Sequence, residues 1–320
     1  MTSPTVATRT GIAQIALSVL DGQRSHDWYA EGLGLLPAGT LQPTADLSAV
    51  QGVPDARVGD LLWLVDANPF FQFEIFQYAS PPVRPQPADR RACDLGYARL
   101  GVWVADLDVT LERLRALGTT PLTAAVGTAG ARRVCVLDPD GVVIELMEDR
   151  APTPDQAPST RPEAPAAARS ITVSVADVDA ALRYYADAIG LVPVTDFALH
   201  TDEHEALWRL PGARANRALL AGGDLWLEVV QYTDPVGRAR PADYRISDQG
   251  ILNIAVAGRS VAAYEALRDR VVAGGYGVYE PIVREHIRVH YAHGPDGLSV
   301  EMSYFDEDLD AKQGFLPLAR

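Results

Sequence analysis

The chain contains one stretch twice, reading SVLDGQRSHDWYAEGLGLLP at residues 18–37 and SVADVDAALRYYADAIGLVP at residues 174–193. Both copies read as the end of a strand followed by a helix that stops at a glycine. The repeat continues in three further pairs of segments: 74–78 with 228–232, 84–96 with 238–250, and 138–147 with 294–303. A period of about 155 residues is far too long for a solenoid repeat, so each copy is predicted to be a domain.

Composition agrees with two packed domains, since the chain has 320 residues, of which 48% are hydrophobic and 22% charged. We predict a first domain at 8–150, with modules at 8–83 and 96–150. A Pro/Ala-rich linker is expected at 151–168. The second domain is expected at 169–306, with modules at 169–237 and 250–306, and is followed by a tail at 307–320.

Charge and patterning exclude several classes of partner. The net charge of −14 argues against a nucleic-acid surface, which needs clustered cations. No apolar segment is long enough to span a bilayer, and the first ten residues lack the apolar core of a signal peptide. Cys93 and Cys135 show no motif spacing. We therefore expect a cytoplasmic protein with neither a nucleic-acid nor a membrane partner, and with no organic cofactor.

Each predicted module reads as a strand, a helix and further strands, and its last strand carries one glutamate among apolar residues. The four glutamates are Glu74, Glu145, Glu228 and Glu301. Alternate side chains of a strand face opposite sides, so each glutamate lies on the more polar face of its strand. A buried carboxylate without a partner is costly, and each should therefore meet a cation, a proton or hydrogen-bond donors.

Two motifs carry a resemblance to a known family. The first is D-x-x-x-(S/A)-x-x-(W/Y)-Y-x-x-x-(L/I)-G-L, at 21–35 and 177–191; the second is DPDG-x-x-x-E, at 138–145 and, with glycine for the first aspartate, at 294–301. Together they resemble the vicinal oxygen chelate superfamily, which includes glyoxalase I, extradiol dioxygenases and bleomycin-resistance proteins. The resemblance covers the chain outside the linker. It implies an α+β fold, a tandem duplication in which four βαβββ modules form two open mixed-sheet barrels.

In that family, the first and last strands of paired modules supply the ligands of a divalent metal. Carried onto this sequence, the resemblance gives the first half Gln14, Glu74, Arg99 and Glu145. Arg99 stands where glyoxalase I has a histidine. A guanidinium is permanently charged and cannot bind a metal. The first half is therefore expected to be metal-free, with Arg99 either binding a substrate carboxylate or only pairing with the two glutamates.

The same correspondence gives the second half Ser170, Glu228, Asn253 and Glu301. The expected metal ligands are Glu228, Asn253 and Glu301. These are oxygen donors, which suit Mg²⁺, Mn²⁺ or Ca²⁺ better than Zn²⁺ or Fe²⁺. The missing imidazoles disfavour extradiol ring cleavage.

Five of the six histidines lie in the second half. His200 and His204 fall in a loop that could cover the barrel mouth. His290, Tyr291 and His293 lie on the strand before Glu301, and the loop length decides whether His290 or Tyr291 with His293 faces inward. Either choice puts a titratable or hydroxyl group beside a carboxylate.

The second half is therefore the predicted active half. The predicted catalytic residues are Glu301, Glu228, Tyr291 and His290. The predicted substrate-binding residues are Ser170, Asn253, His293, Trp226, Arg245 and Arg99. For Arg245 the alternative is a structural role in the crossover loop that holds it.

The expected function is that of a lyase or isomerase that moves a proton on a small apolar oxygenated metabolite, with or without a divalent metal. The alternative is a non-catalytic protein that binds and sequesters a small molecule, as resistance proteins do. Four modules in one chain can close both barrels without a partner subunit, so either a monomer or a homodimer is compatible with the sequence.

Overall fold

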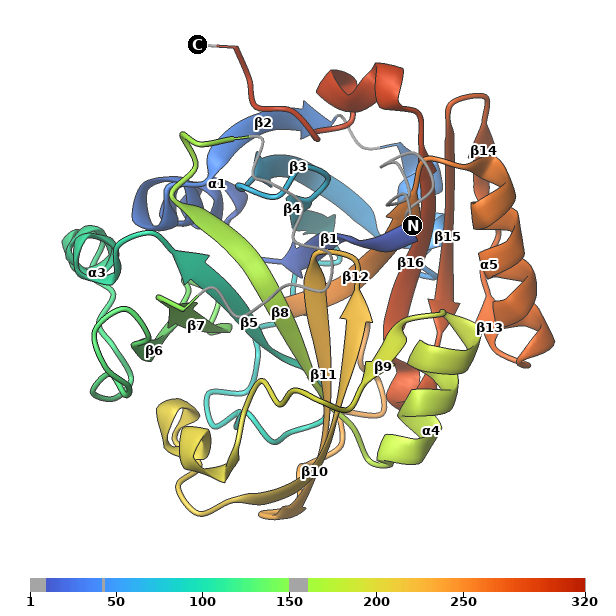
Figure 1. Ribbon diagram of the computed structural model, residues 1–320. Coiled ribbons are helices and arrows are strands. Elements are labelled where there is room, and N and C mark those ends of the chain that lie inside the picture. Colours follow the sequence, from blue (N-terminus) through green and yellow to red (C-terminus); the bar gives the residue numbers. More distant parts are fainter. Residues whose placement is uncertain (1–9, 42–43, 150–160, 320) are drawn as a thin grey trace, which may run out of the picture.

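The computed structural model describes residues 10–41, 44–149 and 161–319, and it contains four modules that each begin with a strand and a helix (Figure 1). Module 1 comprises β1 (Thr10–Ser18), α1 (Gly22–Asp27), the π-helix η2 (Trp28–Gly32), β2 (Leu36–Leu41), α2 (Ala45–Val50), β3 (Arg57–Val65) and β4 (Gln72–Ser80). Module 2 comprises β5 (Gly96–Val104), α3 (Leu107–Ala116), β6 (Arg133–Leu137) and β7 (Val143–Met147).

Module 3 comprises β8 (Ala166–Ser174), α4 (Val178–Leu182), the π-helix η3 (Arg183–Ala188), β9 (Val192–Val194), η4 (Asp202–Trp208), β10 (Arg214–Gly222) and β11 (Leu225–Asp234). Module 4 comprises β12 (Gly250–Gly258), α5 (Val261–Ala273), β13 (Gly277–Val278), β14 (Ile282–Arg284), β15 (Ile287–His293), η5 (Pro295–Gly297) and β16 (Ser299–Phe305). A last 3-10 helix, η6 (Glu307–Lys312), follows.

The repeated aspartates of the sequence motif begin the helices. The side chain of Asp21 accepts a hydrogen bond from the backbone N–H of Arg24, and Asp177 caps α4 in the same way. Asp106 and Ser260 cap α3 and α5. Such a cap satisfies one of the free N–H groups of the first turn and contributes about 1 kcal/mol.

The modules pair across the two halves of the chain and not within them. Sheet A has the order β13-β15-β16-β12-β1-β4-β3-β2, with β14 on β15, and joins modules 1 and 4 through the antiparallel pair β1–β12. Sheet B has the order β6-β7-β5-β8-β11-β10-β9 and joins modules 2 and 3 through β5–β8. The expectation that each half builds its own barrel is therefore wrong. All four first strands have the same alternating pattern, which does not specify the partner strand.

The two loops that cross between the sheets are joined to each other by two sets of ion pairs, which we call the clasps. Arg84 donates to the carboxylates of Asp243 and Asp248 at 2.6–2.7 Å, and Arg238, its counterpart in the second copy, donates to Asp89 and Asp94 at 2.6–3.2 Å. Each bidentate fork reproduces the other across an approximate two-fold axis. The repeated pattern R-x-x-P-A-D-x-R-x-x-D, at 84–94 and 238–248, is thus explained mainly by these reciprocal clasps.

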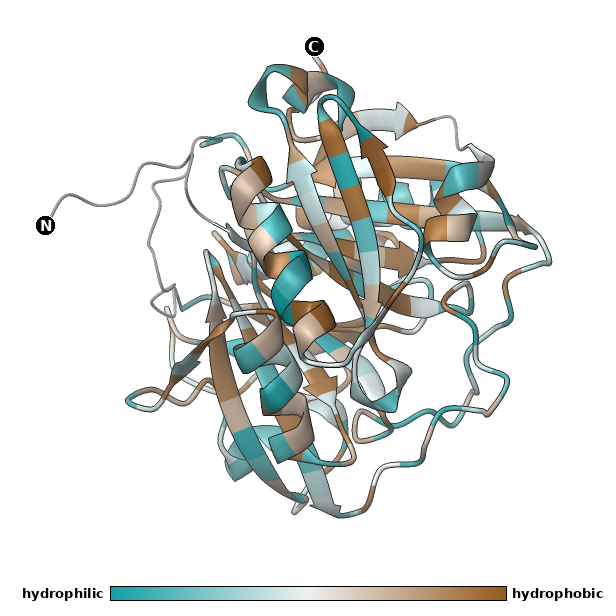
Figure 2. Ribbon diagram, turned by 90° about the vertical axis from the view of Figure 1, so that its right-hand side faces the viewer, coloured by the Kyte–Doolittle hydropathy of each residue, from teal (hydrophilic) through white to brown (hydrophobic). Residues whose placement is uncertain are grey.

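A shared core binds the sheets to their helices. Apolar residues of all four modules form one buried cluster, which includes Ile15, Leu100, Ile171 and Ile254 from the four first strands. The helix segment α1–η2 packs against α3, and η3 packs against α5. Figure 2 shows α4 and α5 on one side of the molecule, with strands behind them. None of the helices in the described residues is long and apolar enough to cross a membrane.

The ends of the predicted linker and tail are structured. Strand β8 begins at Ala166, inside the segment assigned to the linker, most of which lies outside the described residues. In the tail, Phe315 is fully buried and its ring lies 4.6 Å from that of Phe70. The tail therefore packs against module 1.

Candidate functional site

The inner face of sheet A brings together four polar side chains, one from each of its central strands. They are Gln14, Glu74, Asn253 and Glu301, which we call the sheet A quartet, and all are buried. The strand register explains the arrangement. Glu74 and Asn253 flank Ala16 on either side of β1, while Gln14 and Glu301 flank Ala255 of β12. The quartet thus occupies two adjacent rows of one sheet, with two members from each half of the chain.

The two carboxylates of the quartet have hydrogen-bond donors but no cation. Trp63 Nε1 donates to Glu74 Oε1 at 2.8 Å, and the Gln14 amide also bonds to Glu74. The Tyr291 hydroxyl donates to Glu301 Oε2 at 2.7 Å, and Ser303 Oγ donates to Oε1. No ion pair among the described residues involves Glu74 or Glu301.

Because Glu74 and Glu301 are buried and form no ion pair among the described residues, their pKa values are raised. Desolvation and the negative charge of Glu301 raise the pKa of Glu74 from 4.5 to about 8. Burial also raises the pKa of Glu301, although the hydroxyls of Ser303 and Tyr291 oppose the shift. Two neighbouring carboxylates whose pKa values are raised in this way do not both ionise at neutral pH, so the pair keeps one proton unless a cation joins it.

Unsatisfied amides adjoin these carboxylates. Neither Oδ1 nor Nδ2 of Asn253 has a hydrogen-bond partner, although the residue is completely buried, and Oε1 of Gln14 has none either. A buried amide without partners costs free energy, so an arrangement of this kind points to a ligand that satisfies it. Two carboxylates and two amide oxygens are a donor set that fits a hard divalent cation. Within the described residues, no three His, Cys, Asp or Glu side chains form a metal-binding group, so the amides are necessary to this set.

The inner face of sheet B carries residues equivalent to the quartet, but there the two carboxylates contact cationic side chains. Glu145 and Glu228 occupy the positions of Glu301 and Glu74, and His200 lies between them. The two ring nitrogens of His200 are each 2.8 Å from a carboxylate oxygen, Nε2 from Glu145 and Nδ1 from Glu228. Arg99 donates to Glu228 and to Thr172 at 3.1 Å, and its guanidinium stacks on Trp208 at 3.6 Å. We call Arg99, Glu145, His200 and Glu228 the sheet B cluster.

Within the sheet B cluster, the positive charges of Arg99 and His200 balance the negative charges of the two glutamates. Burial alone would lower the pKa of His200, but the two carboxylates raise it from 6.5 to about 9, so the ring is an imidazolium at neutral pH. Burial opposes ionisation of Glu145 and Glu228, yet His200 and the neighbouring arginines together outweigh it and lower the pKa of each to about 2. Arg133, 3.5 Å from Glu145, adds to the effect. An imidazolium thus occupies the space between the carboxylates of sheet B, whereas among the described residues no cationic side chain pairs with those of sheet A.

The metal set predicted from sequence is therefore divided between two sites. Glu228 lies in the sheet B cluster, whereas Asn253 and Glu301 lie on sheet A. The alternative in which Arg99 only pairs with Glu74 and Glu145 is wrong for Glu74, because Arg99 and Glu74 belong to different sheets and the ion pair of Arg99 is with Glu228. Both errors follow from the pairing of modules across the halves.

The register of β15 settles which of its side chains face inward. Tyr291 lies opposite Glu301, and His293 lies opposite Ser299, on the inner face. His290 points to the other face, where its Nδ1 hydrogen bonds to the Tyr264 hydroxyl under α5. His290 is therefore not part of the site, and its predicted catalytic role is wrong.

Three other predicted site residues lie elsewhere. Ser170 is buried beside Gly101 of sheet B, and Trp226 is also on that sheet, packed on Phe197 with a centroid distance of 5.7 Å. Arg245 forms an ion pair with Asp55 at 2.6 Å and borders a cavity at the mouth of sheet A. None of the three contacts the quartet.

Two buried polar residues near the two sites lie in loops, where no sequence pattern predicts their positions. His200, expected only as part of a lid, and Gln51 both come from the segment between the second and third strands of their modules. Gln51 Oε1 accepts from Tyr78, and its Nε2 donates to the Tyr291 hydroxyl at 3.3 Å. A buried polar residue in an irregular segment has no periodicity that would reveal it.

Comparison with known proteins identifies the fold. No protein-family model matches the chain, and no curated protein matches its sequence. Among solved structures, glyoxalase I from Zea mays is similar over 97% of both chains, with 16% identity and a TM-score of 0.62. A Bacillus subtilis protein provisionally described as a dioxygenase is similar over 98% of this chain and 92% of its own, with 15% identity and a TM-score of 0.63.

The chain therefore has the fold of the vicinal oxygen chelate superfamily, in its tandem four-module form. At these identities the likeness concerns the fold and not the reaction.

Proposed function

We propose that the chain is a lyase or isomerase of the glyoxalase-like type, with its reaction centre at the sheet A quartet. The observation that carries the proposal is the pair of buried carboxylates, Glu74 and Glu301, with no cationic partner among the described residues and with the unsatisfied amide of Asn253 beside them. Sheet B keeps the same two glutamates but fills the space between them with its own imidazolium.

The quartet fits a divalent cation held by Glu74, Glu301 and the amide oxygens of Gln14 and Asn253. When bound, such an ion would stabilise negative charge that develops on a carbonyl or enol oxygen of the substrate. The set contains no imidazole, so Mg²⁺, Mn²⁺ or Ca²⁺ suits it better than Zn²⁺ or Fe²⁺.

The chain's own residues would move the proton. Without a cation the pKa of Glu74 is raised to about 8; a bound cation would lower it, so Glu74 would be ionised and able to accept a proton at neutral pH. Trp63 fixes the orientation of its carboxylate, while Tyr291 and Ser303 fix that of Glu301. The apolar side chains around the quartet, among them Phe76, Leu252 and Val289, keep water away and strengthen these interactions.

The test combines metal binding with proton exchange. Purified chain stripped with a chelator is titrated with Mn²⁺, and small ketones and hydroxyketones in D₂O are then followed by proton NMR for loss of the signal of the hydrogen next to the carbonyl. We expect about one Mn²⁺ per chain, and metal-dependent exchange. Glu74→Gln and Glu301→Gln should lose both. Glu228→Gln, the matched change in sheet B, should keep both.

A non-catalytic binding role is the second candidate, and the packing of the inner face favours it. Trp63, Tyr78 and Tyr291 fill much of the space over sheet A. If ketones bind in the Mn²⁺ form but no hydrogen exchanges, the binding role replaces the enzyme. If Glu74→Gln and Glu301→Gln bind Mn²⁺ as well as the unchanged chain, the quartet is not a metal site.

A further inference from the structure

A cavity of about 490 Å³ opens at the mouth of sheet A, two residues along β15 and β16 from Tyr291 and Glu301. Its wall includes Gln51, Arg240, Tyr244, Tyr279, His293 and Ser299. This volume is in the range of small-molecule sites. Apolar side chains, Val53, Ile246 and Leu252, form part of the same wall.

Two polar groups of this wall have no partner. Ser299 is almost completely buried, yet its Oγ makes no hydrogen bond, and Nε2 of His293 is buried and equally unpartnered. The two residues face each other across β15 and β16. The ring of Tyr279 packs edge-on against His293 at 4.4 Å and fixes its position. Unpaired donors that line a cavity indicate a bound group that pairs with them.

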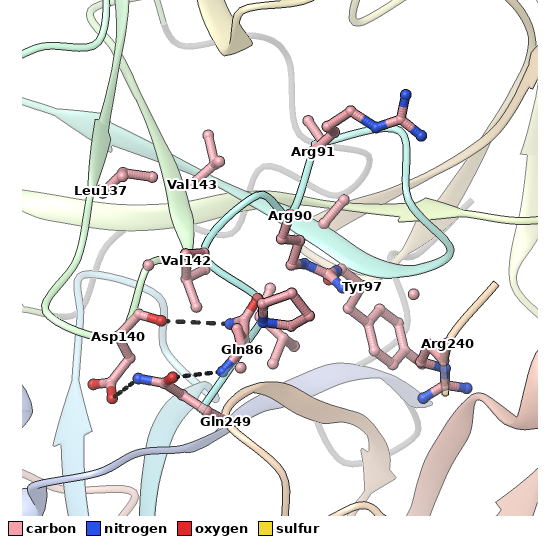
Figure 3. Close-up of a pocket in the computed structure, with 18 of the residues that line it drawn as sticks. Gln86, Arg90, Arg91, Tyr97, Leu137, Asp140, Val142, Val143, Arg240 and Gln249 are labelled. Carbon is pink, nitrogen blue, oxygen red and sulfur yellow. Dashed lines mark hydrogen bonds between the residues drawn. The ribbon is translucent and has the colours of Figure 1, made fainter. Parts of the chain in front are cut away.

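The other copy has a corresponding cavity without these groups. Figure 3 shows it, with a volume of about 340 Å³, between the first crossover loop and the β6–β7 turn. Leu137 and Val143 stand there at the places of His293 and Ser299. Among the described residues, the polar pair therefore lies at the mouth of sheet A and has no counterpart at the mouth of sheet B.

The cavity also contains an arginine without a carboxylate partner. Arg240 stacks on the ring of Tyr244 at 4.0 Å and donates one hydrogen bond to the backbone oxygen of Asp296. It takes part in no ion pair within the described part of the chain. The other arginine of the wall, Arg245, is paired with Asp55. In a chain of net charge −14, an unpaired guanidinium beside two unpaired donors favours an anion locally.

The cavity is connected to the reaction centre. The pair His293–Ser299 lies two residues along the strands from the pair Tyr291–Glu301, which corresponds to about 7 Å. At the inner end of the cavity, Gln51 donates to Tyr291, and Tyr291 donates to Glu301. A molecule held at the mouth would therefore have its next carbons directed toward the carboxylate pair.

We infer that this cavity binds the carboxylate of a small acid that has an apolar body, with Arg240, Ser299 and His293 holding the carboxylate. The inference rests on the proposed function, since it names the class of substrate that the sheet A quartet acts on. The apolar wall accepts the body of the acid, and the orientation brings its oxygenated carbons toward Glu301.

The experiment compares a carboxylate with its uncharged counterpart. Binding of phenylacetate and of phenylacetamide to the full chain is measured by NMR titration, with and without Mn²⁺. We expect phenylacetate to bind at least tenfold more tightly than the amide. Arg240→Gln and Ser299→Val should each reduce this preference about tenfold or more. Val143 occupies the matching place in the other copy, so valine is compatible with the fold at position 299. Arg240 lines both cavities, whereas Arg90 lines the other cavity and is not part of this wall, so Arg90→Gln should leave the preference unchanged.

Each outcome bears on a separate claim. Equal affinity for the acid and the amide overturns the inference, as does a loss in Arg90→Gln equal to that in Arg240→Gln. Ser299→Val should still bind Mn²⁺, because Ser299 is not a member of the quartet. Loss of the carboxylate preference with Mn²⁺ binding intact supports the inference. Absence of Mn²⁺ binding in the unchanged chain, with the preference for phenylacetate present, contradicts the proposed function alone.

Discussion

The stability of the protein should depend on the ionisation of a single buried histidine, His200. In the folded chain, Glu145 and Glu228 raise its pKa from 6.5 to about 9. A group whose pKa is raised by folding stabilises the folded state below its unfolded pKa and loses that effect as the pH rises. The contribution should therefore be complete below pH 6.5 and should disappear as the pH passes through 9.

The size of the effect follows from the shift. A difference of about 2.5 pKa units corresponds to about 3 kcal/mol, at 1.36 kcal/mol per unit. Removing one partner of a buried ion pair costs a similar amount, about 3–5 kcal/mol. His200→Gln keeps hydrogen-bonding capacity but no charge, so it should be about 3 kcal/mol less stable than the unchanged chain at pH 6. The difference should fall toward zero by pH 10.

The measurement is urea denaturation of both proteins at pH 6, 7, 8, 9 and 10. His286→Gln serves as the control, because His286 is exposed and pairs with Asp306 at the surface. It should follow the unchanged chain at every pH. A difference between the His200 variant and the unchanged chain that stays constant from pH 6 to pH 10 would refute the assignment of a protonated imidazole.

Three further outcomes are expected. In metal-free protein, Glu74→Gln should raise stability at pH 8.5 but not at pH 4, because folding raises the pKa of Glu74 from 4.5 to about 8, so the charged unfolded form is favoured progressively from pH 4.5 to pH 8 and the full cost is present at pH 8.5; urea denaturation at the two pH values measures this. Arg84→Ala and Arg238→Ala should lower the melting temperature by similar amounts in thermal scans, because the two clasps are equivalent, and unequal shifts would contradict that equivalence. Gly52→Ala should cost about 2 kcal/mol in denaturant titrations, because Gly52 has a φ of +76° and a Cβ there would overlap the ring of Tyr279; an unchanged midpoint would contradict this.

Most of the secondary structure could be predicted from the sequence. Alternation of apolar and polar residues predicts strands at 12–19, 98–104, 251–257 and 286–292, and these correspond to β1, β5, β12 and β15 within about two residues. Alternation and capping signals are local, so the sequence carries them directly. The short strands β2, β9, β13 and β14 were not predicted, because two to six residues are too few to show a period.

The grouping of residues into sites could not be predicted. Each of the four glutamates was correctly expected on an inner face, but which glutamate meets which depends on the β1–β12 and β5–β8 pairings. Those pairings join residues far apart in the chain, and both alternatives bury the same apolar faces. The position of His200 depends on a loop conformation, which alternation does not encode.

The pairing of modules across the two halves has a consequence for the history of the protein. If each half once existed as a separate chain, two identical copies would have associated to form both sheets, and both sites would have had the same residues. A change at the position now held by Arg99 and Asn253 would then have altered both sites together. Joining the copies in one gene removed that constraint. One site could then acquire its own cations, while the other could keep its carboxylates free for a ligand.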